Sequence, residues 1–274
     1  MLPVSMSVHP AAADASASTP TPASAPSPAS APSPASAPAP VPGSLHYFVL
    51  LYSPAARRAT LAALLAVAEE IGSGVGRSLE HTVQHLRLDW WRRETERFER
   101  AEPQHPWLRA LQMQQPDSQR LDLRSLVDAA AQDLATRTLA SRAGSELQRA
   151  LFVLVARMLE VPADSATLQS IGALGELSQR LEAAAAQVVD DAQGLDALLR
   201  ALQRHAQLID SALQPRLAPL LVWSALAAAH ARRRLRRRHA GSRLDGLRDN
   251  LRAWQAARLA ARGRFRILAA RSAT

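Results

Sequence analysis

The chain lacks cysteine and lysine and contains few aromatic residues. Its 274 residues include no cysteine, which excludes disulfide bonds, thiol catalysis and cysteine-ligated metals. All 33 residues counted as lysine plus arginine are arginine, and only 4% of the chain is aromatic. Alternating β-branched stretches are also absent, so we expect no β-sheet. The longest apolar run, residues 216–231, is shorter than the roughly 20 residues that span a bilayer and contains Pro219, so we expect no transmembrane helix.

Residues 1–43 differ in composition from the rest of the chain. They consist mostly of alanine, proline and serine and hold 11 of the 18 prolines. Proline removes backbone donors and the segment has little apolar surface to bury, so it is predicted to be a disordered leader. It has neither a basic n-region nor a continuous apolar core, and is therefore not expected to be a secretory signal.

The remaining residues predict an all-α fold. Long runs of alanine, leucine, arginine, glutamate and glutamine are strong helix formers from Leu45 onward. Apolar residues recur at helical spacing over wide faces, so about eight or nine helices should pack into a single bundle. We assign residues 44–240 to this helical domain and residues 241–274 to a basic C-terminal helix and tail. Gly72-Ser-Gly-Val-Gly76 is expected to weaken or break the helix that begins at Pro54.

A long helix is predicted over residues 78–100. Its apolar residues form a stripe that consists of Leu79, Val83, Leu86 and Trp90. A second set, Leu88, Trp91 and Phe98, widens this stripe. Helical spacing of this kind marks the side of a helix that faces a core. We therefore expect the adjacent Trp90 and Trp91 to lie on the packed side of this helix.

The same helix carries the most specific motif of the chain. Residues 84–94 read Gln-His-Leu-Arg-Leu-Asp-Trp-Trp-Arg-Arg-Glu, and His105-Pro106 follows. This pattern resembles the "RLxWWRxEL … hPvxxAL" signature of the squalene/phytoene synthase family. Weaker matches occur in order over roughly residues 45–240, and include Arg57-Arg58, Glu70-Ile71 and Asp133-Leu134. The resemblance implies an all-helical isoprenoid-synthase fold and head-to-head joining of two isoprenyl diphosphates.

The aspartates that hold Mg²⁺ in this family are missing. In the alignment Gly72, Ser73 and Gly76 stand at the first aspartate motif, and Ala183 and Gln187 stand at the second. In the family, two such motifs on facing helices hold the Mg²⁺ ions that stabilise the departing pyrophosphate. Uncharged side chains cannot hold Mg²⁺ in this way. The resemblance therefore implies a degenerate family member that is not catalytically active and binds no cofactor.

Some alternatives to complete loss of catalysis stay open. A small gap in the alignment would bring Asp190 or Asp191 into the last motif position, and Glu69 or Glu70 could ligate one ion. The protein would then be an active prenyltransferase with an altered metal site, and Mg²⁺ would be its cofactor.

A degenerate member would bind an isoprenoid or lipid in an apolar central pocket, or act as an accessory or assembly factor. Degenerate relatives that look like respiratory-complex assembly factors provide an analogy. The candidate ligand-binding residues are Arg57, Arg58, Glu70, Trp90, Trp91, Arg92 and Arg93.

Positive charge is concentrated near the C-terminus. The net charge is +9, and residues 232–271 hold 14 arginines against Asp245 and Asp249. The densest cluster comprises Arg232, Arg233, Arg234, Arg236, Arg237 and Arg238. This cluster could meet an anionic membrane surface, which predicts a cytoplasmic protein at the inner face of a membrane. Alternatives are a solvated helix end enriched by codon bias and a basic nucleic-acid-binding protein, although no aromatic residues interleave the cluster as single-stranded nucleic acid would require.

Two further patterns have ordinary explanations. Gly72–Gly76 resembles a nucleotide loop, but such loops follow a strand and this segment follows a predicted helix. His81 and His85, with Asp89 one turn on, have a spacing that can bind zinc, but surface or capping histidines are the default explanation. We therefore predict no metal site.

Overall fold

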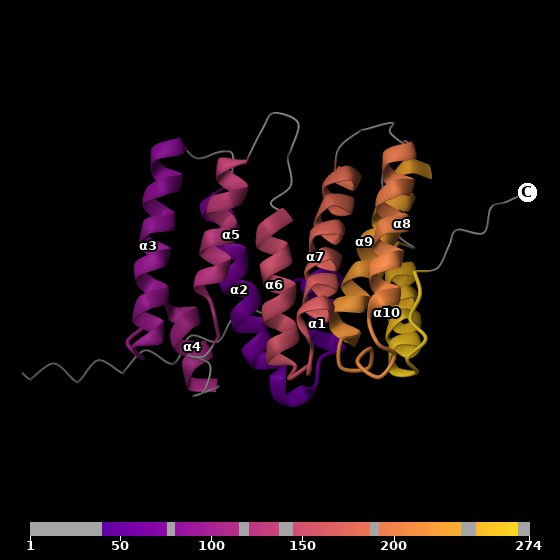
Figure 1. The fold of residues 1–274 in the computed structure, drawn as a ribbon, viewed down its shortest axis with the longest axis horizontal. Coiled ribbons are helices and arrows are strands. Elements are labelled where there is room, and N and C mark those ends of the chain that lie inside the picture. Colours follow the sequence, from indigo (N-terminus) through magenta and orange to yellow (C-terminus); the bar gives the residue numbers. More distant parts are fainter. Residues whose placement is uncertain are drawn as a thin grey trace, which may run out of the picture. The chain divides into compact units, whose positions relative to one another are not determined.

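The computed structural model describes residues 40–75, 80–114, 121–136, 145–186, 192–236 and 245–267. In these residues the chain forms ten α-helices, a short 3₁₀ helix and no strand (Figure 1). The all-α prediction is confirmed, with ten helices in place of the expected eight or nine. All described residues belong to one compact unit, residues 34–274. Residues 1–39 of the predicted leader lie outside the described part of the chain.

The helices follow one another with short connections. They are α1 (Leu45–Leu51), α2 (Arg58–Gly74), α3 (His81–Glu99), α4 (Pro106–Gln114), α5 (Arg124–Ala135), α6 (Ser145–Met158), α7 (Ser165–Ala186), α8 (Ala192–Leu208), α9 (Ala218–Arg236) and α10 (Asp245–Ala261). The 3₁₀ helix, Ala55–Arg57, directly precedes α2. No described helix combines the length and the apolar character that a bilayer crossing requires.

Carboxylates fix where two central helices begin. The Asp133 carboxylate, on α5, accepts hydrogen bonds from the backbone nitrogens of Glu146 and Leu147 at 3.0 and 2.9 Å. The Asp164 carboxylate accepts from the backbone nitrogen of Thr167 at 2.7 Å, and hydrogen bonding to Thr167 lowers its pKa. Both contacts satisfy N–H groups that a helix start leaves without a partner. The contact from Asp133 also joins α5 to α6.

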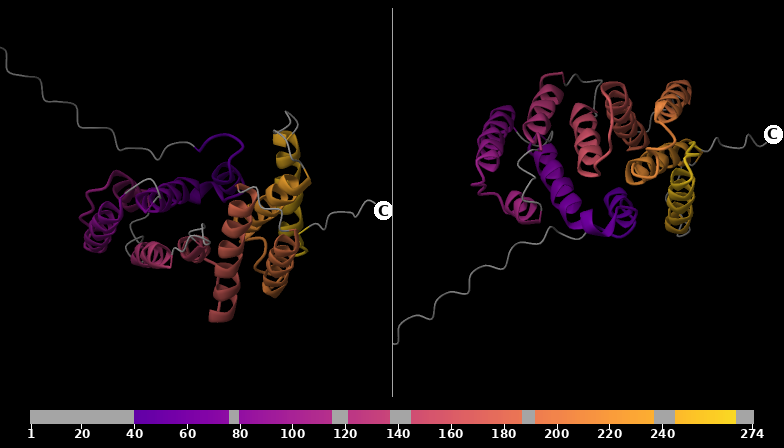
Figure 2. Two further views of the ribbon diagram at one scale, coloured as in Figure 1. Left: turned by 90° about the horizontal axis from the view of Figure 1, so that it is seen from above. Right: turned by 60° about the horizontal axis from the view of Figure 1, so that its bottom comes forward.

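Helix α6 packs against three neighbours, α5, α2 and α7 (Figure 2). Its approach to α7 is close at two glycines. A Cβ atom on Gly175 would lie 2.5 Å from the Gln148 carbonyl oxygen and 2.8 Å from Phe152 Cγ. A Cβ on Gly172 would lie 3.0 Å from Arg149 Cγ. Only glycine at position 175 allows the two backbones to come so near.

Helix α2 ends at Gly74, inside the glycine-rich segment 72–76, so the expectation that this segment weakens or breaks the helix is confirmed. The expected apolar stripe on the next helix was partly wrong. On α3, Val83, Leu86 and Trp90 are exposed, and Leu79 lies outside the described residues. The buried side of α3 is the other expected set, Leu88, Trp91 and Phe98, together with the polar residues Gln84, Glu94 and Thr95.

The C-terminal part of the described chain packs on the same core. Helix α10 lies against α9, and the following segment buries Phe265 and Ile267. The backbone nitrogens of these two residues donate to the side-chain oxygens of Gln214 and Gln203 at 2.8 and 2.7 Å. These bonds tie residues 265–267 to α8 and to the turn that precedes α9.

Candidate functional site

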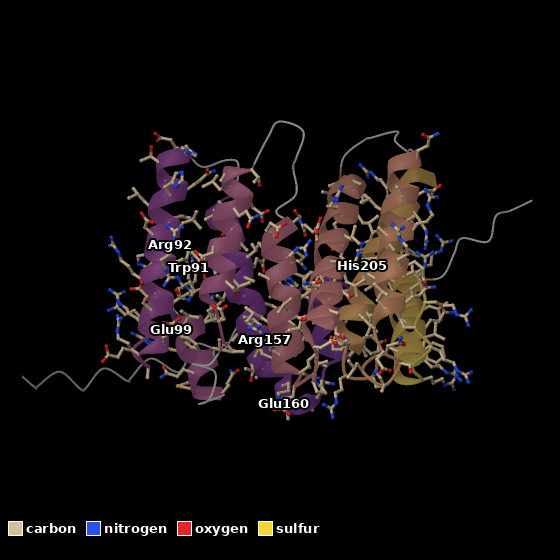
Figure 3. All side chains as sticks on the ribbon, viewed as in Figure 1. Trp91, Arg92, Glu99, Arg157, Glu160 and His205 are labelled. Carbon is tan, nitrogen blue, oxygen red and sulfur yellow. The ribbon has the colours of Figure 1, made fainter. Side chains whose placement is uncertain are left out.

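The two adjacent tryptophans of α3 lie in different environments. Trp91 is buried, and its ring lies 4.8 Å from the ring of His105 and 5.1 Å from the ring of Trp90. Trp90 is 41% exposed, so the prediction that both rings lie on the packed side holds for Trp91 and is wrong for Trp90. Consecutive residues on a helix point about 100° apart, so one flat interface does not bury both. Figure 3 shows Trp91 and Arg92 on α3.

Glu94 ties the tryptophan motif to the His-Pro turn. Its carboxylate is fully buried and accepts hydrogen bonds from the backbone nitrogens of Gln104 and His105, at 2.5 and 2.6 Å. Arg97 donates to the second carboxylate oxygen at 3.1 Å. Pro106 then begins α4. The sequence analysis did not predict this role of Glu94. The only indication of it in the sequence is an acidic residue among the residues of the buried face of α3.

His105 links this turn to α2. Its Nε2 lies 2.9 Å from a carboxylate oxygen of Glu70, while the backbone nitrogen of Trp107 donates to its Nδ1 at 3.3 Å. The second contact leaves Nδ1 as an acceptor, so in the neutral ring Nε2 carries the proton and donates to Glu70. The candidate ligand residue Glu70 therefore already has a partner in the fold.

The candidate arginines divide into two kinds. Arg57 pairs with Glu160, beyond the end of α6. Arg58 donates to the backbone carbonyls of Leu51 and Ser53, both at 3.1 Å, and so satisfies the end of α1. These contacts give both residues a structural role.

The other two candidate arginines lie on α3. Arg92 pairs with Asp89 at 2.7 Å and lies 3.8 Å from Asp128 of α5. Arg93 is exposed.

The first motif position is packed against a leucine. A Cβ atom on Gly72 would lie 3.1 Å from Leu147 Cδ2, at the start of α6. The hydroxyl of Ser73 donates to the Glu70 carbonyl of its own helix at 2.8 Å, and Gly76 lies outside the described residues. The nearest acid in the sequence besides Glu70 is Glu69, whose carboxylate lies 3.7 Å from His46 Nδ1. The acids beside the first motif therefore face two different histidines.

The second motif positions lie at and beyond the C-terminal end of α7. Ala183 is half-buried on α7, whereas Gln187, Asp190 and Asp191 lie outside the described residues. The neighbouring Glu182 accepts a hydrogen bond from Trp223 Nε1 at 2.8 Å. Burial raises the pKa of this carboxyl, against the opposing effects of the Trp223 bond and of His230. Sequence reasoning missed this buried acid, because its partner is far away in the chain.

The two helices that carry the motif positions, α2 and α7, both pack against α6. Among the residues that the structure describes, no group of three or more histidine, aspartate or glutamate side chains is arranged to hold a metal ion. His81 and His85, the zinc candidates, lie with their Nε2 atoms 3.0 Å apart and their rings edge to face.

The basic cluster at the end of α9 is only partly described. Arg233 donates to both carboxylate oxygens of Asp249 on α10, at 2.5 and 2.9 Å. Arg232 is half-buried and Arg234 is exposed. Arg237 and Arg238 lie outside the described residues, as does the side chain of Arg236.

Comparison with known families bears on the same residues. The family description "Squalene/phytoene synthase" matches residues 42–181, which is over half of the chain. The chain belongs to the squalene/phytoene synthase family. The matched stretch runs from just before α1 into α7 and ends at Leu181, so it is shorter than the 45–240 resemblance and stops before Ala183. No curated protein and no solved structure matches the chain.

Squalene/phytoene synthase-like proteins act as prenyltransferases through Mg²⁺ ions, and the residues at the motif positions here do not fit such ions. Mg²⁺ prefers several hard oxygen ligands in near-octahedral geometry. The first motif offers Gly72, which lies against a leucine side chain, and Ser73, whose hydroxyl is bonded to its own helix. We therefore derive no reaction step through Mg²⁺ for this chain.

Proposed function

We propose that this squalene/phytoene synthase-like protein no longer condenses isoprenyl diphosphates. It would instead bind an isoprenoid or related lipid, or act as an accessory factor in a complex at the cytoplasmic face of a membrane. The observation that carries the proposal is the contact between Gly72 of α2 and Leu147 of α6.

The physical argument concerns the charge of the leaving group. Ionisation of an allylic diphosphate needs cations that stabilise the departing pyrophosphate, and carboxylates must hold those cations. At position 72 an added Cβ atom would lie 3.1 Å from Leu147 Cδ2, so a carboxylate side chain there would have to displace this leucine or point away from it. Loss of one electrostatic stabiliser costs about 3–4 kcal/mol of activation free energy. Loss of most of two metal-binding motifs would therefore leave turnover far below that of an active enzyme.

The position of the remaining acids supports the same conclusion. Glu69 lies toward His46 of α1, and Glu70 toward His105 before α4. To ligate one shared ion, the two carboxylates would have to leave these partners. This rearrangement is the structural requirement of the rival function, an active prenyltransferase with an altered metal site.

For a lipid ligand, the contacts favour part of the candidate set. Arg57, Arg58, Glu70 and Trp91 are engaged in contacts that hold the fold together. Trp90 and Arg93 are exposed on α3. We assign Trp90 to contact with the apolar part of a ligand and Arg93 to an anionic headgroup.

The test of catalysis is incubation of the full chain with farnesyl or geranylgeranyl diphosphate and Mg²⁺. We expect no pyrophosphate release above the buffer control. Measurable release that depends on Mg²⁺ would establish the prenyltransferase alternative instead.

The test of binding uses farnesyl diphosphate without metal and follows the thermal midpoint of unfolding. We expect a rise in the midpoint that is lost in Trp90→Ala/Arg93→Gln. Glu99→Gln, an exposed substitution on the same helix, should keep the rise. An unchanged midpoint with farnesyl diphosphate and with farnesol would leave the accessory role as the function.

A further inference from the structure

The outer face of α10 carries three large exposed apolar side chains. Leu247, Leu251 and Trp254 are 68%, 54% and 48% exposed. Spacings of four and three residues place them on one side of the helix, within about 11 Å along its axis. The opposite side is buried and made of small residues, including Ala253 and Ala256. We call Leu247, Leu251 and Trp254 the α10 ridge.

Exposed arginines accompany the α10 ridge on the same helix and in the segment after it. The guanidinium of Arg258 lies 5.1 Å from the centre of the Trp254 ring, in a cation–π contact. Further exposed arginines on α10 and in the segment after it are Arg248, Arg262, Arg264 and Arg266. The face therefore has an apolar centre with positive charge beside it.

Both acids of α10 are engaged with cations. Asp245 lies 3.5 Å from Arg248, in the first turn of the helix. Asp249 is buried against α9, where Arg233 donates to both its oxygens and His230 lies 3.2 Å away. Burial raises the pKa of Asp249, but the hydrogen bonds and charges of His230 and Arg233 outweigh this and lower it overall. The helix consequently presents cations on its outer side.

The α10 ridge belongs to a helix that is already folded. Helix α10 packs on α9 and lies at the edge of the helical bundle in each view (Figures 1 and 2). The Arg233–Asp249 pair and the alanine side of α10 fix which face looks outward. Binding through this face would need no folding of the helix.

We propose that the outer face of α10 docks on an anionic lipid bilayer. The α10 ridge enters the headgroup region, and the arginines beside it pair with lipid phosphates and carboxylates. A helix with an apolar face and flanking arginines lies in the bilayer interface in this way. Tryptophan favours that interface because its ring is apolar and its indole N–H is polar. This inference does not depend on whether the protein has lost catalysis.

The arrangement favours lipid over nucleic acid. A nucleic acid backbone is met by cations at the centre of the contact, because phosphate neutralisation supplies most of the affinity. Here the centre is apolar and the cations flank it. The arrangement also differs from the basic cluster singled out in the sequence, since Arg233 of that cluster is bound to Asp249.

The test compares full-length proteins in sedimentation with vesicles. The ridge variant is Leu247→Ser/Leu251→Ser/Trp254→Ser. The matched control is Leu86→Ser/Leu208→Ser, which removes leucines that are 64% and 67% exposed on α3 and α8. With vesicles of phosphatidylcholine and about 30% phosphatidylserine, we expect the ridge variant to lose at least about tenfold in partitioning. The control should stay within about twofold of the unmodified protein.

A charge variant provides a second measurement if the ridge variant fails to fold. Arg258→Gln/Arg262→Gln should lower partitioning by more than about tenfold, since each arginine near an anionic surface contributes about fivefold. The loss should shrink at high salt and vanish with pure phosphatidylcholine.

Several results would overturn the proposal. One is equal partitioning of the ridge variant and the unmodified protein, and another is equal binding to neutral and anionic vesicles. Duplex DNA binding that survives in the ridge variant, without vesicle binding, would identify a nucleic acid contact. If the unmodified protein is a dimer that the ridge substitutions convert to a monomer, again without vesicle binding, the partner of this face is a second copy of the chain.

Discussion

At the scale of single residues, the structure gives the motif acid Glu94 a structural task. A buried carboxylate that accepts two backbone N–H groups and one arginine fixes the turn before α4. The side chains of the tryptophan motif are then held against His105. The tryptophan motif is therefore a packing unit of the fold as well as a sequence signature of the family.

Glu94→Gln should destabilise the protein. An amide oxygen can keep the two bonds that Oε1 accepts from Gln104 and His105, but the NH₂ group then faces the Arg97 donor, so the bond that Oε2 accepts is lost. We expect the free energy of unfolding in urea to fall by about 1–3 kcal/mol. Glu99→Gln, exposed on the same helix, should change it by less than about 0.5 kcal/mol. Equal effects of the two substitutions would show that the turn does not depend on the Glu94 carboxylate.

Glu182 should make stability depend on pH. Burial raises its pKa above the ordinary value of 4.5, so the folded protein holds the proton more tightly than the unfolded chain. Its contribution to stability is then present below pH 4.5 and is lost as the pH rises through the folded pKa. The Glu182→Gln side chain cannot ionise, so the substitution removes this pH-dependent loss of stability. Its amide oxygen can still accept the hydrogen bond from Trp223.

The measurement is urea unfolding of both proteins between about pH 4 and pH 7. Relative to Glu182→Gln, the unmodified protein should become steadily less stable as the pH rises over this range. His46 also contacts Trp223, and burial lowers its pKa despite the opposing effect of Glu69, but its titration is common to both proteins. A constant difference between the two proteins would contradict the raised pKa of Glu182.

At the scale of elements, the α6–α7 contact depends on glycine. Gly175→Ala would place Cβ 2.5 Å from a backbone oxygen of α6, which cannot move without shifting the helix. We expect a loss of about 1–3 kcal/mol in the free energy of unfolding. Gly246→Ala on α10 is the control, because nothing lies within 4 Å of its added Cβ. The control should be neutral or more stable by up to about 1 kcal/mol.

Helix positions could be predicted from the sequence because their causes are local. Pro106 begins α4, and Pro219 lies in the first turn of α9, where a missing N–H costs nothing. The buried face of α3 could not be predicted in the same way. Two apolar rows interleave on that helix, and the choice between Leu86 and Leu88 depends on which neighbours arrive from α2, α4 and α5.

The candidate site was predictable only in part. Helical spacing identifies Trp91 as a core residue, and the residue types lead to the prediction that positions 72 and 183 have lost the aspartates of the family. The contact between Gly72 and Leu147 joins residues that are distant in sequence, as does the bond between Trp223 and Glu182. Pairings across such separations leave no periodic signal in a single sequence.

At the scale of the whole molecule, the packing of α6 against α2 and α7 bears on the proposed loss of catalysis. Restoring one aspartate to each motif, as Gly72→Asp/Ala183→Asp, should not restore pyrophosphate release from farnesyl diphosphate with Mg²⁺. The reason is that Leu147 of α6 occupies the space beside position 72. Adding Leu147→Ala to this double variant removes the obstruction and is the informative comparison. Turnover in the double variant alone would show that the motif helices still face a common cavity.

The hydrogen bonds that the Glu94 carboxylate accepts affect how the turn before α4 opens. Loop amides usually exchange their hydrogens with solvent far faster than those of helices. The amides of Gln104 and His105 are bonded to a carboxylate of α3 with no exposed surface, so we expect them to exchange only when the turn before α4 moves away from α3. Their exchange would thus report cooperative opening of the core and not local fraying of a connection.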